Sequence, residues 1–129
     1  MTKEELLSLS KEKLAELVEI CSKNAIAMDG VWFQSVERKF GMDEAIFHDE
    51  EAWRRYTVIE AKRIKKFLNL GEAPGLEGLK RALELRVYAN ANLCRAEFDG
   101  KALIYSNVVC RVQAARTRKG TPESTPSCG

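Results

Sequence analysis

The sequence predicts a mostly helical α+β domain, with a β-hairpin and a short final helix towards its C-terminal end. Three observations indicate this fold class. Apolar residues recur at steps of three and four as far as Val87, as on one face of an α-helix. From Cys94 onwards, apolar and polar residues alternate, as in a half-buried strand. The dipeptide Asp99-Gly100 then favours a tight two-residue turn into a second strand.

Helical segments are expected on both sides of residue 30. Thr2 to Glu5 has the spacing of a capping box and begins a short first helix. Ser10 is expected to cap the next helix, whose apolar residues lie at helical spacing: Leu14, Leu17, Val18, Cys21, Ala25 and Met28. Asp29-Gly30 interrupts this pattern, as a break or as a kink. A further helical segment, from Val31 to Phe40, ends at the glycine that follows it.

A strong helix is expected to begin with Asp49 as its N-cap. Glu50 and Glu51 fall in its first turn and basic residues fill its last turns, which complements the helix macrodipole. Its apolar stripe consists of Trp53, Tyr56, Ile59, Ile64, Phe67 and Leu68. The segment from Gly71 to Gly75 ends this helix, and the leucines that follow predict another one, giving four or five helices in this part of the chain.

The hairpin precedes a last helix. Its return strand, Lys101 to Val109, is expected to place alternate residues on one face. Because two strands alone are marginally stable in water, the hairpin must pack on helices, extend a larger sheet or pair with another chain. A short helix is predicted from Val112 to Lys119. The expected organisation is one domain over residues 1–120, followed by a flexible tail over residues 121–129.

The composition favours a small cytoplasmic protein. The length of 129 residues suits a single domain, and a net charge of +2 is too small to indicate nucleic acid as a partner. The four cysteines form no C-x-x-C pair, and the first 30 residues carry no signal sequence. No apolar run reaches membrane-spanning length. We therefore expect a reducing, cytoplasmic location and no membrane partner.

Cys110 is the first candidate catalytic residue. It lies between the return strand and the last helix, where unpaired N–H groups and the positive end of the macrodipole favour a thiolate. A nucleophilic cysteine also needs a base, and His48 is the one histidine of the chain. Three carboxylates could orient that base: Asp29, Asp49 or Glu60. The alternative is that Cys110 is a small buried apolar residue.

A small-molecule site is the second candidate. Asp29 would lie at the mouth of an apolar pocket in which Trp32 and Trp53 hold a planar ligand, since such sites combine aromatic walls with a few polar groups. The alternative is a capping carboxylate followed by core aromatics. Arg111 and Gln113 of the last helix are further candidate ligand-binding residues.

A metal site is the third candidate. Cys110 and Cys128 are its proposed ligands, because thiolates bind zinc and iron–sulfur centres. Two thiols do not complete a tetrahedral site, so Cys94, His48 or a second subunit would have to supply the remaining ligands. The sequence identifies no particular cofactor.

Four short motifs stand out along the chain: Met28-Asp29-Gly30-Val31-Trp32-Phe33, Phe40-Gly41, Glu51-Ala52-Trp53-Arg54-Arg55-Tyr56, and Cys110-Arg111-Val112-Gln113 with Lys119-Gly120. Together they resemble an uncharacterised family of small prokaryotic cytosolic proteins, itself similar to the L-2-amino-thiazoline-4-carboxylic acid hydrolase-like family. The resemblance covers about residues 5 to 128 and implies an α+β domain with a cysteine-centred site. Members commonly continue beyond the position of Cys128 with more cysteines, so a site completed by those would be incomplete here or supplied by another subunit.

Three functions follow as expectations. The first is binding of a small molecule between the aromatic helices and Cys110. The second, implied by the resemblance, is hydrolysis of a small amide or cyclic thio-compound, in which Cys110 attacks, His48 acts as base and Asp29 orients or binds. The third is a metal- or redox-linked accessory role using Cys110 and Cys128. Apolar helix faces that a small domain does not bury alone also predict a homodimer, with the hairpin edge or the long helices at the interface.

Overall fold

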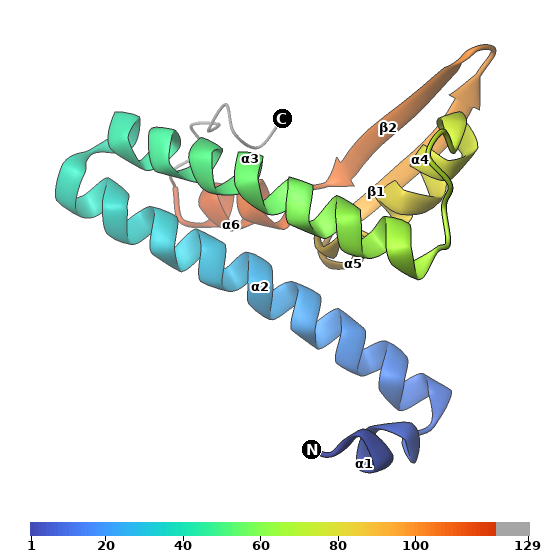
Figure 1. The fold of residues 1–129 in the computed structure, drawn as a ribbon. Helices are drawn as coiled ribbons and strands as arrows, with labels where there is room; N and C mark the ends of the chain where they lie inside the picture. The colour runs from blue at the N-terminus through green and yellow to red at the C-terminus, as the bar shows by residue number, and fades with distance from the viewer. Residues whose placement is uncertain (121–129) are drawn as a thin grey trace.

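A computed structural model describes residues 1–120 of the chain. Six helices and two strands follow one another as α1 (Lys3–Leu7), α2 (Lys11–Phe40), α3 (Met42–Phe67), α4 (Gly75–Glu84), α5 (Val87–Ala91), β1 (Leu93–Asp99), β2 (Ala102–Val109) and α6 (Arg111–Arg118). This is the predicted mostly helical α+β fold, with a hairpin and a short last helix (Figure 1). The two long helices form an antiparallel pair, and the hairpin projects away from the end of α3.

The predicted capping residues begin the first two helices. Thr2 and Glu5 form both halves of the capping box of α1. The hydroxyl of Ser10 accepts a hydrogen bond from the backbone N–H of Lys13 at 3.3 Å. From there α2 continues through Asp29-Gly30 without a break. One interior glycine costs a helix only about 1 kcal/mol relative to alanine, so contacts along the remaining turns of α2 outweigh it.

Gly41 forms the corner between the long helices. Its N–H donates to the carbonyl of Glu37 at 2.9 Å, and its own carbonyl accepts from the N–H of Ala45 at 3.2 Å. A φ of +94° lets this single residue end α2 and begin α3. Because α3 starts here, the expectation that Asp49 is an N-cap is wrong: Asp49 lies in the second turn of α3, and its side chain is buried.

The strands form the predicted antiparallel hairpin, but the register differs from the predicted one. Ala96 faces Tyr105 and Asp99 faces Ala102, so the two-residue loop consists of Gly100 and Lys101 rather than Asp99-Gly100. Gly100 has a φ of +56°, whereas Lys101 has no positive φ, which is the pattern of a type II′ turn. The hairpin contacts α4, and the predicted alternation holds only in part. Cys94, Ala96, Leu103 and Tyr105 are half-buried, whereas three other residues predicted on the same face are exposed: Phe98, Asn107 and Val109.

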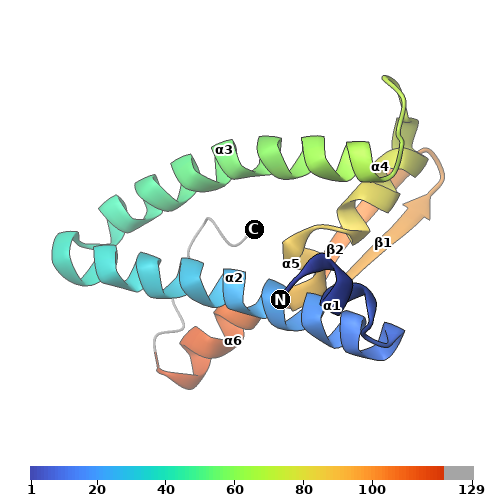
Figure 2. The same ribbon diagram turned by 60° about the horizontal axis from the view of Figure 1, so that its bottom comes forward.

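Figure 2 shows α2 and α3 meeting at the corner and separating towards their other ends, with α6 against α2. The apolar side chains that are buried in residues 1–120 are few: Ile26, Phe33, Ala45 and Ala91. Polar contacts therefore take a large share in joining the elements. Within the described range, none of the helices has the length and apolar character needed to cross a membrane.

Glu60 provides one such polar contact. Its carboxylate accepts a hydrogen bond from Nε of Arg86 at 2.9 Å and another from the backbone N–H of Val87 at 2.8 Å. The Glu60 side chain is buried and that of Arg86 is about a quarter exposed. Because Val87 is the first residue of α5, this one carboxylate ties the middle of α3 to the start of α5.

Candidate ligand-binding site

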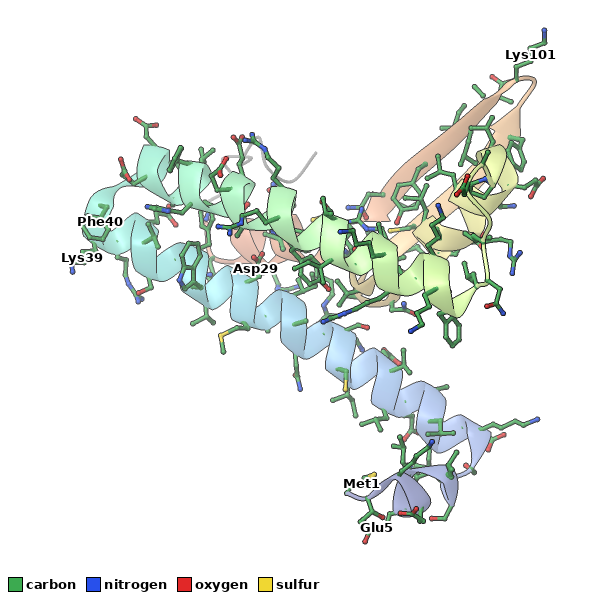
Figure 3. All side chains as sticks on the ribbon, in the orientation of Figure 1. Met1, Glu5, Asp29, Lys39, Phe40 and Lys101 are labelled. Atoms are coloured by element: carbon green, nitrogen blue, oxygen red, sulfur yellow. The ribbon has the colours of Figure 1, made fainter. Side chains whose placement is uncertain are left out.

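A partly open cavity of about 950 Å³ lies where α2, α3 and α6 meet. Apolar and ionisable side chains both line it; those used below are Ile26, Asp29, Phe33, Asp49, Trp53, Tyr88, Arg111 and Arg116. Its volume is near the upper end of the range of about 300–1,000 Å³ typical of small-molecule sites. Figure 3 labels Asp29 on the side of α2 that faces α3 and α6.

Two carboxyl groups meet in the wall of this cavity. Asp29 comes from α2 and is half-buried, while Asp49 comes from α3 and is buried. Burial, together with repulsion from and a hydrogen bond to the neighbouring Asp49, raises the pKa of Asp29 from its ordinary 3.8 to about 6. A hydrogen bond with Trp53 acts in the opposite direction on the same pKa. Asp29 therefore holds its proton up to a higher pH than an ordinary aspartate.

Helix α6 is held as a wall of the cavity at both of its ends. At one end, both Nη atoms of Arg116 donate to the carboxylate of Glu37 on α2, each at 3.3 Å. At the other end, the backbone N–H of Arg111 donates to Oδ1 of Asn92 at 2.8 Å. The backbone N–H of Arg111, the first residue of α6, therefore donates to Asn92. The side chain of Cys110 accepts no capping hydrogen bond from α6, so this expected stabilisation of a thiolate is not seen.

Cys110 is the N-cap of α6, at the predicted junction of strand and helix. Its sulfur lies 3.4 Å from the hydroxyl of Tyr88, and that hydroxyl accepts a hydrogen bond from Nδ2 of Asn107 at 2.8 Å. The neighbours Val109 and Arg111 line the cavity, but Cys110 is not among the lining residues. The thiol therefore adjoins the cavity through Tyr88 instead of opening into it.

His48 lies in a different part of the molecule. Its imidazole is half exposed, pairs with Glu44 at 3.6 Å and packs edge-on against Trp32 and Phe47. These contacts are near the Gly41 corner, whereas Cys110 is next to α5, and no hydrogen bond joins the two side chains. The arrangement that a Cys110–His48 nucleophile requires is not present.

The remaining predicted residues divide into two groups. Asp29, Trp53 and Arg111 come together around the cavity. Trp32 is exposed on another side of α2, and Gln113 is half-buried on α6; neither lines the cavity. The predicted aromatic site thus keeps one indole ring instead of two.

Tyr88 and the Glu37–Arg116 pair were not predicted, and Asp49 was considered only as an N-cap or as a carboxylate that orients a base, not as a neighbour of Asp29. A helix starting at Met42 places Asp49 on the same face as Ala45 and Trp53, at spacings of four residues, and this was the signal available in the sequence. No comparable signal marks Tyr88 or the Glu37–Arg116 pair, because their contacts join residues far apart in the chain.

The predicted metal site is only partly within the described residues. Over residues 1–120, no cluster of three or more histidine, cysteine, aspartate or glutamate side chains could hold a metal ion. Cys128, the second predicted thiolate ligand, lies outside this range. The pairing of Cys110 with Cys128 stays a prediction.

The fold and the site define a class of protein: a small, mostly helical α+β domain in which two long helices carry a carboxyl pair in a partly open cavity that α6 also lines. The chain belongs to a family of unknown function, DUF6125, whose sequence model matches residues 6–128. The expected membership of a family without an assigned function is thereby confirmed. Comparisons with curated proteins and with solved structures found no match.

Proposed function

We propose that this protein binds a small organic molecule in the cavity between α2, α3 and α6. The observation that carries the proposal is the contact of Asp29 with Asp49 in the cavity wall. Placing two carboxyls together in a partly buried site costs stability when both are ionised, as they are above the pKa of about 6. A bound ligand that donates hydrogen bonds to the pair would offset the same cost. The pair is therefore better suited to recognition than to packing.

The lining charges indicate the class of ligand. A carboxyl pair favours an N–H donor or a cationic nitrogen, and the ring of Trp53 offers a flat apolar surface beside it. Arg111 and Arg118 of α6 bring positive charge to the same cavity. The favoured ligand is a small planar molecule with a nitrogen donor group at one end and a carboxylate at the other.

A cytoplasmic location and a homodimer are part of this proposal. Cys21, Cys94 and Cys110 are free thiols, which suits a reducing compartment. Many large apolar side chains of residues 1–120 are exposed, among them Met28 and Phe67. Association with a second copy would cover part of this apolar surface.

A cysteine-dependent hydrolase of a small amide or cyclic thio-compound is the second candidate function. The contact between Tyr88 and Cys110 favours it, because Tyr88 lines the cavity and touches the thiol. The base that this function would require is not His48, whose contacts are elsewhere. The metal- or redox-linked role depends on Cys128 and gains no support from residues 1–120.

Fluorescence of Trp53 tests the binding function. The chain has two tryptophans, so a Trp32→Phe variant leaves Trp53 as the only indole, at the cavity. The probes are 4-guanidinobenzoate, which carries both charges, and benzamidine and benzoate, which carry one each. We expect a saturable change in emission, with the doubly charged probe binding most tightly.

Two further variants make this experiment specific. At pH 7.5, above the pKa of about 6, Asp29→Asn should weaken binding of 4-guanidinobenzoate by about tenfold, or about 1.4 kcal/mol, because the pair then loses a negative charge. Glu50→Gln removes an exposed carboxylate from the same α3 helix that carries Asp49 and should leave binding unchanged. If none of the three probes produces saturable binding, the proposed ligand class is wrong.

A further inference from the structure

A second apolar face of α2 is covered only in part by residues 1–120: Leu14 and Leu17 are half-buried and Trp32 packs edge-on against His48, whereas the residues between them are exposed. We name it the outer stripe, and it consists of Leu14, Leu17, Val18, Cys21, Ala25, Met28 and Trp32. At 100° per residue, these positions fall within a sector of about 100°. The buried face of α2, around Ile26 and Phe33, is centred about 120° away from it. Met28, near the end of the stripe, is 71% exposed.

The outer stripe carries no charge. From Leu14 to Ser35, the charged residues of α2 are Glu16, Glu19, Lys23 and Asp29. The first three lie on the far side of the helix from the stripe, and Asp29 is half-buried at its edge. A helix face in permanent contact with water is normally polar. An uncharged half-circumference over six turns is typical of a face that contacts another protein surface.

The exposed area of the chain is large enough to include an interface. The chain exposes 9594 Å², whereas a compact monomer of 14.6 kDa exposes about 6,900 Å². A fully extended chain of nine residues exposes about 1,300 Å², and this area is the most that residues 121–129 can add to the difference. The remaining excess of about 1,400 Å² exceeds the roughly 800 Å² that each subunit buries in a standard interface and lies in the range of stable homodimers.

We infer that the occupant of the outer stripe is the same stripe of a second copy of this chain, in antiparallel orientation. This inference rests on the proposed homodimer and assigns its surface. Large side chains lie towards the ends of the stripe and small ones, Cys21 and Ala25, near its centre. Two such helices approach closely at their centres. Leu14 then meets Trp32 of the partner subunit, and Val18 meets Met28 of the partner subunit.

The hairpin edge is less suited to this contact. Its exposed side chains include Arg95, Glu97 and Lys101, and charged residues on an edge strand oppose pairing with another strand. The long helices are therefore favoured over the hairpin as the interface.

A matched pair of variants on α2 tests the surface. Val18 and Ile20 are both 53% exposed, but only Val18 belongs to the outer stripe. Sedimentation of the full chain should show a dimer at micromolar concentration. Val18→Glu should raise the dissociation constant at least tenfold, and Ile20→Glu should leave it unchanged. Far-UV circular dichroism should report the same helix content for both variants.

The outcomes separate the dimer from its surface. A wild-type chain that sediments as a monomer overturns both the homodimer and the stripe pairing. A dimer that tolerates Val18→Glu overturns the stripe alone. Neither outcome bears on ligand binding in the cavity, which the probe titration measures on its own.

Cross-linking tests the antiparallel orientation. Each of two chains carries one cysteine, Val18→Cys or Met28→Cys, with all four natural cysteines replaced by serine. With a short bismaleimide, the two chains should form a covalent dimer when mixed, and the Val18→Cys chain should not cross-link to itself. Self-linking of Val18→Cys without mixed linking would show a parallel pairing and contradict the proposal.

Discussion

Asp29 and Asp49 lie on different helices, yet their carboxyl groups share a hydrogen bond in the wall of one cavity. Gly41 makes the contact possible, because it reverses the chain within one residue and brings the facing turns of α2 and α3 together. Burial and the repulsion between the two groups keep Asp29 protonated to a higher pH than an ordinary aspartate. The stability of the packing between α2 and α3 therefore depends on pH.

Asp29→Asn should change how stability depends on pH. The folded protein holds the proton of Asp29 up to a pKa of about 6, against 3.8 ordinarily, so the unfolding free energy falls as pH rises between these values. Above pH 7 this contribution of Asp29 to the unfolding free energy is fully lost, and below pH 3.8 it is fully present. Asparagine keeps a hydrogen-bond donor for Asp49 without the charge. We expect the variant to be more stable than wild type by about 2 kcal/mol at pH 7.5, after allowance for partial exposure, and equal at pH 3.5.

Urea denaturation at a series of pH values measures this difference. Glu50→Gln removes an exposed carboxylate from α3 and serves as the control, with a difference from wild type that stays constant with pH. An Asp29→Asn curve parallel to wild type over pH 3.5–7.5 would show that the pair does not titrate as described.

Two glycine substitutions should act in opposite directions. An added Cβ meets no atom within 4 Å at either Gly30 or Gly41, so neither change creates a clash. Gly41 has φ +94° and ψ 174°, a region that only glycine adopts readily, so Gly41→Ala should lower the unfolding free energy by about 1–3 kcal/mol. Gly30 is helical, so Gly30→Ala should raise it by about 1 kcal/mol.

Thermal and urea unfolding of these two variants provide the measurement. Equal effects of both substitutions would contradict the sharp corner at Gly41, since a continuous helix through residue 41 would gain from alanine as residue 30 does.

Glu60→Ala should be strongly destabilising. The substitution leaves the side chain of Arg86 and the N–H of Val87 without the carboxylate that binds both. Loss of one member of a buried ion pair costs about 3–5 kcal/mol, and the partial exposure of Arg86 places the expected loss near the lower end of that range. Glu72→Ala, at an exposed loop position, should change the unfolding free energy by less than about 0.5 kcal/mol.

Glu37→Ala should loosen α6. The Arg116 side chain is 9% exposed, so its guanidinium loses a partner in a place that water hardly reaches. We expect the backbone amides of α6 to exchange with solvent at least tenfold faster, measured by hydrogen exchange and mass spectrometry. The matched control is Glu51→Ala, which breaks an exposed pair with Arg54 and should leave exchange in α3 unchanged. Unchanged exchange in α6 would mean that other contacts hold the helix.

Features that depend on neighbouring residues could be predicted from the sequence. The capping box of Thr2 and Glu5, the cap at Ser10 and the position of Cys110 between strand and helix are all confirmed. Each depends on residues within one or two turns, where spacing alone sets the geometry. The start of α3 was mispredicted because the acidic residues after Asp49 also fit the first turn of a helix.

The candidate site could be predicted only in part. Asp29, Trp53 and Arg111 were selected for their chemistry, and the structure places all three around one cavity. The contact between Asp29 and Asp49 was not predicted, because the sequence indicates Asp49 only as an N-cap or as one of three carboxylates that could orient a base. The proposed link between His48 and Cys110 relied on residue types alone, and the two side chains lie in different parts of the fold.

The sequence by itself determined the helices, the hairpin and the uncharged outer stripe of α2, because helical and strand periodicity and charge spacing are local properties. Only the tertiary structure decided that Asp29 meets Asp49, that Tyr88 meets Cys110 and that the outer stripe is not part of the core. These contacts join residues 20 or more positions apart. They depend on how the helices turn about their axes and cross one another, which no local pattern in the chain specifies.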